Sequence, residues 1–398
     1  MRILFSSAPQ YGHTYPLLPL AIAAREAGHE ISYAIDVGFH PLVRRLGFRP
    51  VRAGVNTRAG AAKALQGQAP PPPNPSWRET IPVAVHVFTE AVFRPVAADL
   101  LPLLREDPVD LVVYEPGNPG AALVAHHLGI PAVCHGFSRA SLLSDDFQAM
   151  AADRVRGAAT QVGLTVPDAA FPTFGDPYID VYPPSLQEPS FLDEPARVPL
   201  RPTAFAEPGE LPAVVRRDRD RPLVYLTLGT AVGTVPPLRA AIEGLSRLDI
   251  DLLVAAGPAA PAGELGDLPG NVHVEAWLPQ ADVMPHLDLA VHHGGSGTTL
   301  SAAAAGVPQL FLPVLADHFV NGNGFAAAGA GTWLLPEGTV RFEDRRRNDA
   351  VAAPAIAAAA EALLADPEAT KAAQRVASEI AEMPGPAQVA ARLPGLAR

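Results

Sequence analysis

The stretch that decides the fold lies late in the chain, at residues 289–325, LAVHHGGSGTTLSAAAAGVPQLFLPVLADHFVNGNGF. Residues 289–293 predict a short buried strand, which runs into the glycine-rich turn 294–298 and then into a predicted helix, LSAAAA. The first N–H groups of a helix are free and carry about half a positive charge, and glycines let an anion approach the main chain closely. The stretch therefore predicts a phosphate or pyrophosphate site. Many α/β proteins use the same unit only to pack a helix on a sheet, which is the alternative.

Three polar residues around this turn favour an anion-binding site over a purely structural turn. His293 stands where an imidazole can add a hydrogen bond to a phosphate oxygen. Asp317 and His318 follow the next predicted strand, PQLFLPV, at the edge where open α/β sheets place their ligands.

The composition narrows the number of domains, the kinds of partner and the cellular location that are expected. The chain has 398 residues, of which 48% are apolar, so two α/β domains of ordinary size are expected. The net charge is -11 with only two lysines, Lys63 and Lys371, which argues against a nucleic-acid or anionic-membrane partner. The single cysteine, Cys134, excludes an intramolecular disulfide and a cysteine-rich metal site. No segment reaches 18 uninterrupted apolar residues and the N-terminus is unlike a signal peptide, so we expect a soluble cytoplasmic protein.

A histidine follows the first predicted strand, residues 2–6. The connection from this strand carries neither G-x-G-x-x-G nor a P-loop motif, but it offers Gly12-His13. We expect the positive end of the following helix to disfavour protonation of His13 and to keep it a neutral base near pH 7. On position alone, a capping or packing histidine is the alternative.

A carboxylate is predicted at the same sheet edge. Residues 110–114, DLVVY, predict a buried strand that ends at Glu115, which could orient the His13 imidazole and stabilise its charged form. An exposed strand-end glutamate is the alternative. Residues 56–80 are polar, contain PPPPNP and predict a long mobile loop, and residues 81–104 predict a helix broken near Pro95.

A domain connection is predicted between residues 167 and 222, which contain twelve prolines. From Leu223 a second α/β series begins and predicts a second parallel sheet. We therefore expect one domain at 1–208 and another at 209–398, with a C-terminal helix near 380–398 that packs back on the first domain.

Two motifs resemble those of inverting GT-B glycosyltransferases. GHTYP at 12–16 resembles their G-H-x-x-P loop, and WLPQ at 277–280 with HHGGSGTTLSAAAAGVPQLFLPVLADHFVNG at 292–322 resembles their highly specific donor-binding box. The likeness spans nearly the whole chain and is strongest to actinobacterial enzymes that attach activated deoxysugars to polyketides and other natural products. It implies an α/β GT-B fold, in which two Rossmann-like domains with parallel sheets face each other across a cleft.

The resemblance also implies catalytic and sugar-binding roles. His13 would be the general base that deprotonates the acceptor nucleophile, with Glu115 in the place of a partner acid that is commonly Asp. Asp317 would bind hydroxyls of the donor sugar. His318 stands where these enzymes frequently have Gln, so the identity of the sugar is left undetermined.

The nucleotide-binding roles follow in the same way. Trp277 would stack on the nucleotide base and the Leu278 backbone would hydrogen-bond its edge. Plant relatives that use UDP-sugars carry a Glu that binds both ribose hydroxyls where this chain has Ser301, and a thymidine nucleotide lacks one of those hydroxyls, so we expect a dTDP-sugar. The residues that would cradle the pyrophosphate are Thr230, His293, Gly295, Ser296, Gly297 and Thr298.

The expected reaction is a single displacement that inverts the anomeric carbon, with no metal and no cofactor besides the sugar nucleotide as co-substrate. The triplets 218–220 and 249–251 resemble the D-x-D signature of metal-dependent sugar transferases but lack supporting oxygen ligands nearby. We expect a hydrophobic aglycone as acceptor, contacted by Phe88, Phe93 and Phe137.

Two alternative functions and one question of assembly stay open. A sugar-nucleotide epimerase would need further acid and base residues around the sugar. A non-catalytic homologue that binds or activates a partner enzyme would not need His13 together with the complete cradle. Whether the chain forms a homodimer is left open.

Overall fold

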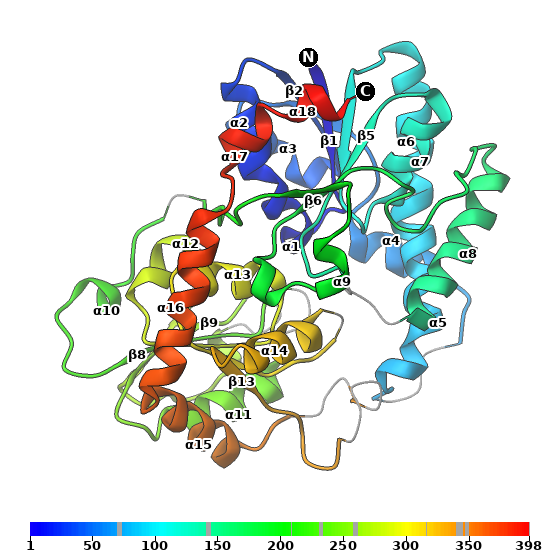
Figure 1. Cartoon of the computed structure of the whole chain (residues 1–398). Coiled ribbons are helices and arrows are strands. Elements are labelled where there is room, and N and C mark those ends of the chain that lie inside the picture. Colours follow the sequence, from blue (N-terminus) through cyan, green and yellow to red (C-terminus); the bar gives the residue numbers. More distant parts are fainter. Residues whose placement is uncertain are drawn as a thin grey trace.

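The computed structural model contains two sheets of parallel strands, each flanked by helices (Figure 1). The first sheet lies in the upper half of the view and the second in the lower half. The structure describes residues 1–69, 74–140, 145–207, 209–230, 234–257, 262–315, 317–339, 345–346 and 350–397.

The first sheet has seven strands in these ranges, in the order β3-β2-β1-β4-β5-β6-β7, and every neighbouring pair is parallel. The strands are β1 (Arg2–Ser6), β2 (Glu30–Ile35), β3 (Arg49–Arg52), β4 (Leu111–Tyr114), β5 (Ala132–His135), β6 (Tyr178–Asp180) and β7 (Arg197–Pro199). The strand order reverses between β1 and β4, which opens a crevice at their carboxyl ends. His13 follows β1 and Glu115 follows β4, so both residues lie at this reversal.

Helices precede and follow these strands as the alternating pattern predicts. They are α1 (Tyr11–Thr14), η1 (Tyr15–Leu17), α2 (Leu18–Glu26), η2 (Val37–Phe39), α3 (His40–Arg45), α4 (Thr57–Ala64), α5 (Trp77–Phe88), the π-helical turn η3 (Thr89–Phe93), α6 (Arg94–Glu106), α7 (Pro119–Leu128), α8 (Asp145–Gln161), η4 (Pro184–Leu186) and α9 (Pro189–Leu192). The expected break near Pro95 takes the form of η3, which joins α5 to α6.

The loop expected at 56–80 is in part a helix. The Asn56 side chain accepts hydrogen bonds from the N–H groups of Arg58 and Ala59 and so caps α4. Gly60 of α4 packs so closely on η3 that an added Cβ would lie 2.8 Å from the Cβ of Ala91. The prediction was wrong here because a cap and a tertiary contact stabilise a short polar helix. Residues 70–73 of the same segment lie outside the described residues.

The second sheet has six strands in the described ranges, in the order β10-β9-β8-β11-β12-β13, again all parallel. The strands are β8 (Leu223–Thr227), β9 (Asp251–Ala255), β10 (Val272–Glu275), β11 (Leu289–His292), β12 (Gln309–Phe311) and β13 (Gly331–Trp333). The helices of this half are α10 (Ala213–Arg216), α11 (Val235–Leu245), η5 (Ala262–Glu264), α12 (Gln280–Val283), η6 (Met284–His286), α13 (Ser296–Ala304), α14 (His318–Ala327), α15 (Ala353–Leu364) and α16 (Pro367–Glu382). The strand order reverses at β8 and β11, which places the glycine-rich turn at the second crevice.

The C-terminal segment returns to the first half of the molecule. After α16, the short helix α17 (Pro386–Ala390) packs on α2, and α18 (Leu393–Leu396) follows (Figure 1). Val389 and Leu393 are fully buried in the same apolar cluster as residues of β1 and α2. The end of the chain therefore adds to the core of the first half.

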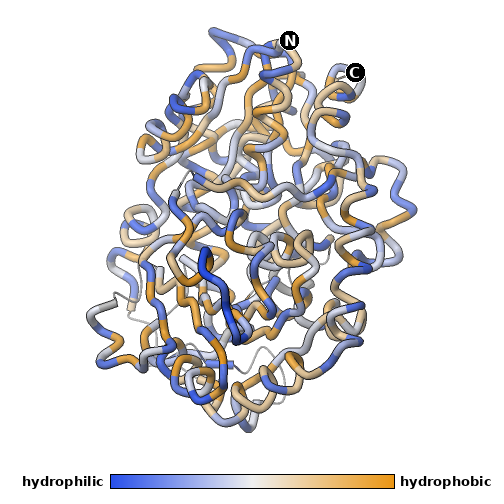
Figure 2. The backbone as a smooth tube through the Cα atoms, turned by 90° about the vertical axis from the view of Figure 1, so that its left-hand side faces the viewer, coloured by the Kyte–Doolittle hydropathy of each residue, from blue (hydrophilic) through white to orange (hydrophobic). Residues whose placement is uncertain are grey.

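Apolar segments lie mainly in the interior of both halves (Figure 2). The central strands β1, β4, β8 and β11 are buried over nearly their whole length, as expected for parallel strands covered on both faces. Among the described residues, no helix combines the length and apolar character needed to cross a membrane.

Candidate active site

A cavity of about 1160 Å³ lies between the two sheets and is lined by residues of both halves. From the first half come the segments that follow β1, β4 and β5. From the second half come Gly229 and Thr230 after β8, the turn after β11, and Asp317 with His318 at the start of α14. The carboxyl edges of both sheets thus contribute to one site, where α/β proteins bind ligands.

His13 and Glu115 form a close pair at the reversal of the first sheet. The Nδ1 atom of His13 lies 3.2 Å from Oε1 of Glu115, an ion-pair contact without the alignment of a linear hydrogen bond. Glu115 is fully buried and is anchored by the N–H groups of Ala8, at 2.9 Å, and Gly117. Gly117 must be glycine here, because a Cβ would lie 2.8 Å from both Glu115 Oε2 and His13 Cε1.

The environment of His13 favours its charged form. Burial lowers the pKa of His13, but the carboxylate of Glu115, aided by that of Asp317, raises it, and the net pKa lies above the usual 6.5. The expectation that a helix end would lower the pKa of His13 was therefore wrong. The helix α1 is a single turn of four residues, and His13 lies in its last turn rather than at its positive end.

The glycine-rich turn is shaped by close contacts. Gly294 has φ 100°, which favours glycine, and a Cβ there would lie 2.9 Å from the carbonyl oxygen of His318. A Cβ on Gly295 would lie 2.5 Å from Nε2 of His293. The turn then enters α13, whose first residue is Ser296, and the next two residues, Gly297 and Thr298, line the cavity with N–H groups that lack a partner within the helix.

His292, at the end of β11, supports this turn through a hydrogen bond to its backbone, a role that the sequence did not predict. It is fully buried, its Nδ1 accepts a hydrogen bond from the Gly294 N–H at 3.1 Å, and its Nε2 lies 2.8 Å from Oε1 of Gln309. These partners place the ring proton on Nε2. Burial, followed by the neighbouring His293, lowers the pKa of His292 to about 3.

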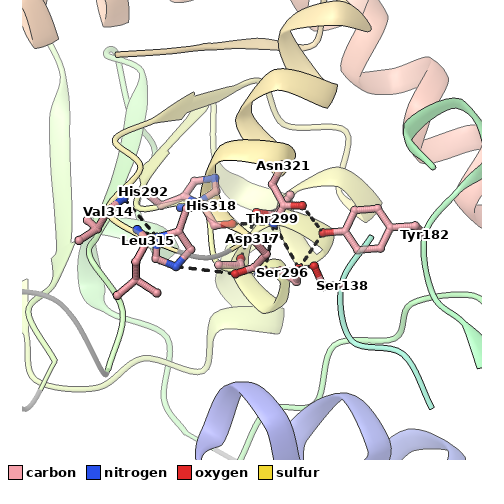
Figure 3. Close-up of polar contacts among 12 residues, drawn as sticks. Ser138, Tyr182, His292, Ser296, Thr299, Val314, Leu315, Asp317, His318 and Asn321 are labelled. Atoms are coloured by element: carbon pink, nitrogen blue, oxygen red, sulfur yellow. Dashed lines mark hydrogen bonds and ion pairs between the residues drawn. The ribbon is translucent and has the colours of Figure 1, made fainter. Parts of the chain in front are cut away.

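His293 and His318 lie edge to face, with ring centroids 4.6 Å apart. Burial is the main reason that the pKa of each is lowered to about 3. His318 accepts hydrogen bonds at Nδ1 from the N–H groups of Val314, at 3.3 Å, and Leu315, at 3.2 Å (Figure 3). Its proton therefore resides on Nε2, 3.9 Å from Oδ1 of Asp317.

Asp317 uses one oxygen to bind its surroundings. Its Oδ2 accepts hydrogen bonds from the Ser296 N–H at 3.2 Å, the Ser296 hydroxyl at 2.6 Å and the Asn321 amide at 3.3 Å (Figure 3). Burial raises the pKa of Asp317, although the hydrogen bonds from Ser296 oppose this shift. Oδ1 is the oxygen that faces His318.

The predicted base-binding residues border the same cavity. Trp277 is 46% exposed, and its ring lies 5.2 Å from that of Tyr11 in the first half of the chain. Leu278 is buried in an apolar cluster of the second half, and Ser301 is 7% exposed and lines the cavity. Of the remaining residues predicted to cradle a pyrophosphate, Gly297 and Thr298 also line it.

Two of the three aromatic residues predicted to contact the acceptor line the cavity. Phe88 is half-buried there, and the ring of Phe137 lies 4.6 Å from the ring of His13. Phe93 is a correction: it is fully buried in the core of the first half, because η3 turns it toward α6 and α7 rather than toward the cavity. Other aromatic residues also line the cavity, among them Phe171, Tyr178, Phe191 and Phe205.

The D-x-D-like triplet at 249–251 has a structural partner. Asp251 begins β9, is almost completely buried, and forms an ion pair with Arg217 at 2.9 Å. Among the described residues, no group of three or more His, Cys, Asp or Glu side chains is placed to hold a metal ion.

Comparisons with known proteins agree on one family. Residues 239–396 match the family described as erythromycin biosynthesis protein CIII-like, C-terminal domain. The L-demethylnoviosyl transferase of Streptomyces niveus is 33% identical over 98% of this chain and 97% of that protein. The elloramycin glycosyltransferase ElmGT of Streptomyces olivaceus is 32% identical over 99% of this chain and 97% of that protein.

Solved structures of similar proteins share the fold over the whole chain. The glycosyltransferase SsfS6 of Streptomyces sp. SF2575, complexed with thymidine diphosphate, superposes with a TM-score of 0.76 at 27% identity and covers 99% of each chain. The glycosyltransferase VinC, in complex with dTDP, gives a TM-score of 0.78 at 25% identity and covers 100% of this chain and 99% of that one. The chain therefore belongs to the natural-product deoxysugar glycosyltransferases of the GT-B fold, with two Rossmann-like domains.

Proposed function

We propose that this glycosyltransferase moves a deoxysugar from a dTDP-sugar to a hydrophobic aglycone and inverts the anomeric carbon. The observation that supports this most is that His13, backed by the buried Glu115, lines the same cavity as the glycine-rich turn at the start of α13. A proton acceptor and an anion site on opposite walls are what a single displacement requires.

His13 acts as the general base in this proposal. Because its Nδ1 faces Glu115, Nε2 is left to accept the proton of the acceptor hydroxyl. As the acceptor oxygen attacks the anomeric carbon, the bond from that carbon to the β-phosphate oxygen breaks and the proton moves to Nε2. The buried carboxylate of Glu115 then stabilises the imidazolium that forms.

The cradle binds the departing dTDP without a cation. The leaving group takes the electron pair of the broken bond, and its growing charge meets the first N–H groups of α13 and the positive end of the helix dipole. With a pKa of about 3, His293 is neutral near pH 7 and contributes a hydrogen bond rather than a charge. We therefore propose that turnover requires no metal ion.

The donor is proposed to be a thymidine nucleotide. Ser301 lines the cavity and is too short to bind both hydroxyls of a ribose. The thymidine diphosphate and dTDP in the structures of SsfS6 and VinC support the same assignment by analogy. Trp277, half-exposed at the cavity, would stack on the base.

The acceptor is proposed to be large and apolar, and in particular aromatic or macrocyclic. The cavity is lined by Phe88, Phe137 and other aromatic side chains, and the ring of Phe137 lies 4.6 Å from that of His13. A volume of about 1160 Å³ exceeds that of most single-ligand pockets and suits two substrates held together.

The test is a mass-spectrometric screen of aglycones against dTDP- and UDP-sugars, with and without EDTA. We expect glycosylated products from dTDP-sugars with apolar acceptors, and undiminished turnover in EDTA. Turnover that is lost in EDTA and restored by Mg²⁺ or Mn²⁺ would contradict the metal-free mechanism. A new sugar nucleotide formed without any acceptor would favour the epimerase instead, and the absence of turnover with every pair would favour a non-catalytic role.

A further inference from the structure

A tyrosine of the first domain reaches the cradle of the second domain. Tyr182 follows β6 and is fully buried, and it does not line the cavity. Its hydroxyl lies 2.7 Å from Oγ of Ser296, the first residue of α13, and donates a hydrogen bond to Oδ1 of Asn321 at 2.8 Å (Figure 3). One side chain therefore contacts both helices that border the proposed pyrophosphate and sugar sites.

Asn321 connects the Tyr182 hydroxyl to the glycine-rich turn through hydrogen bonds. Its amide nitrogen donates to the carbonyl oxygen of Gly294 at 2.7 Å, to Oγ of Ser296 at 3.2 Å and to Oδ2 of Asp317 at 3.3 Å. The amide cannot turn over, because its oxygen would then face the carbonyl oxygen of Gly294, which has no proton to donate. The Tyr182 hydroxyl thus fixes Asn321, and Asn321 fixes the turn.

A second segment of the first domain also contacts the second domain, close to Asp317. Ser138 and Arg139 follow β5, directly after the Phe137 ring that lies against His13. The Ser138 hydroxyl lies 3.4 Å from Oδ2 of Asp317, and the Arg139 guanidinium donates to the carbonyl oxygen of Val320 in α14 at 2.9 Å. Two strand ends of the first domain are thereby fastened to the donor side of the second.

We propose that Tyr182 is a positioning residue for the pyrophosphate site, so that the second domain binds the donor fully only when the first domain is docked on it. The Tyr182 hydroxyl holds Asn321, and Asn321 holds Gly294 and Ser296, so that the first turn of α13 keeps the orientation that faces the pyrophosphate. The inference rests on the proposed donor site, because it explains what holds that site in its binding geometry before the donor arrives.

The experiment is calorimetric titration of Tyr182→Phe with dTDP, combined with an NMR titration of the same protein with thymidine. We expect dTDP to bind about five- to thirtyfold more weakly, the factor that loss of one or two hydrogen bonds between uncharged groups produces, and thymidine to bind as in the wild type. The matched control is Tyr114→Phe, which removes a buried tyrosine hydroxyl that donates to Thr173 and Asp176 within the first domain. This control should leave dTDP affinity unchanged.

A double-mutant cycle with Asn321→Ala separates positioning from a general loss of stability. Because Tyr182 acts through Asn321, the double variant should bind dTDP no more weakly than Asn321→Ala alone. Additive losses, equal losses for thymidine and dTDP, or a Tyr182→Phe affinity within twofold of the wild type would each overturn the proposal. A wild-type chain that binds no dTDP would instead contradict the proposed function.

Discussion

The two walls of the cavity use histidine in opposite ways. On the first domain, His13 lies 3.2 Å from the Glu115 carboxylate, and its pKa is raised above 6.5. On the second domain, burial lowers the pKa of His292, His293 and His318 to about 3. The difference shows that neighbouring charge and burial, rather than residue type, decide whether a histidine moves a proton or only donates a hydrogen bond.

Removal of the proposed general base should have the largest effect on catalysis. His13→Ala should lower kcat by about 10²- to 10⁴-fold on an alcohol acceptor, the usual contribution of a positioned base. Its dTDP affinity should stay near that of the wild type, because the cradle belongs to the other wall. Kinetics and calorimetry check both values, and a phenol acceptor should show a smaller loss because it ionises more readily. A variant with wild-type turnover on the alcohol would remove the base assignment.

A methyl group placed between the two partners should separate them without removing either. In Gly117→Ala, the added Cβ would lie 2.8 Å from Glu115 Oε2 and His13 Cε1, so the pair must move apart. We expect kcat to fall by about 10²-fold, the order of loss that a displacement of about 1 Å causes. Gly157→Ala is the control, since its Cβ meets nothing within 4 Å. Equal activity of the two variants would show that the His13–Glu115 geometry is unimportant.

Neutralising the carboxylate should shift the pH profile rather than abolish activity. Glu115→Gln removes the charge that raises the pKa of His13, so the limb of kcat/KM that reports the free base should move to lower pH. We expect a loss of about tenfold at neutral pH, because the imidazolium formed during reaction loses its counter-charge. A pH profile identical to that of the wild type would contradict the pairing.

The three buried histidines at or next to the glycine-rich turn, here called the cradle histidines, should make the fold sensitive to acid; they are His292, His293 and His318. Their pKa of about 3 in the folded chain compares with 6.5 in the unfolded chain, so between these values the unfolded chain binds more protons. Their contribution to stability is therefore complete above pH 6.5 and falls as the pH drops below it, by about 1.4 kcal/mol per pH unit for each histidine. His135, with a pKa of about 4, acts in the same direction, whereas His13 and Asp317, whose pKa values are raised, act against it.

Urea unfolding between pH 7.5 and 5 measures this slope. The slope of the unfolding free energy against pH reports how many more protons the unfolded chain binds. In His318→Gln this number should be smaller by about one than in the wild type. A free energy of unfolding that is flat over this range would mean that the cradle histidines titrate normally.

The smallest expected effect concerns the ribose. Ser301→Glu adds a carboxylate at the cavity wall that can accept hydrogen bonds from the two hydroxyls of uridine nucleotides. We expect the ratio of UDP to dTDP affinity to rise by about five- to tenfold in calorimetry. An unchanged ratio would place the ribose elsewhere in the cavity.

The sequence predicted the parts of this site that depend on local pattern. The strand, glycine turn and helix at 289–304, and the strand ends that carry His13 and Glu115, were readable because residue periodicity and turn chemistry are local signals. The direction of the His13 pKa shift was not readable, because Glu115 is 102 residues away in sequence but 3.2 Å away in space.

The supporting residues were missed for the same reason. Tyr182 and Ser296 are separated by 114 residues, and the hydrogen bond between them exists only once the domains are docked. The helical turn η3 similarly directs Phe93 into the core, whereas an aromatic pattern alone does not distinguish a core residue from a cavity residue. Contacts across long sequence separations are therefore where structure adds most to the site.

The most direct test of the contrast between the two walls is a ¹⁵N NMR titration of the histidine rings between pH 8 and 5, assigned with single His→Gln variants. We predict that His13 becomes protonated at a pH above 6.5 and that this pKa falls in Glu115→Gln, while His292, His293 and His318 stay neutral throughout the range. A His13 that is still neutral at pH 6.5, or a cradle histidine that gains its proton near that pH, would contradict the division of roles between the two domains.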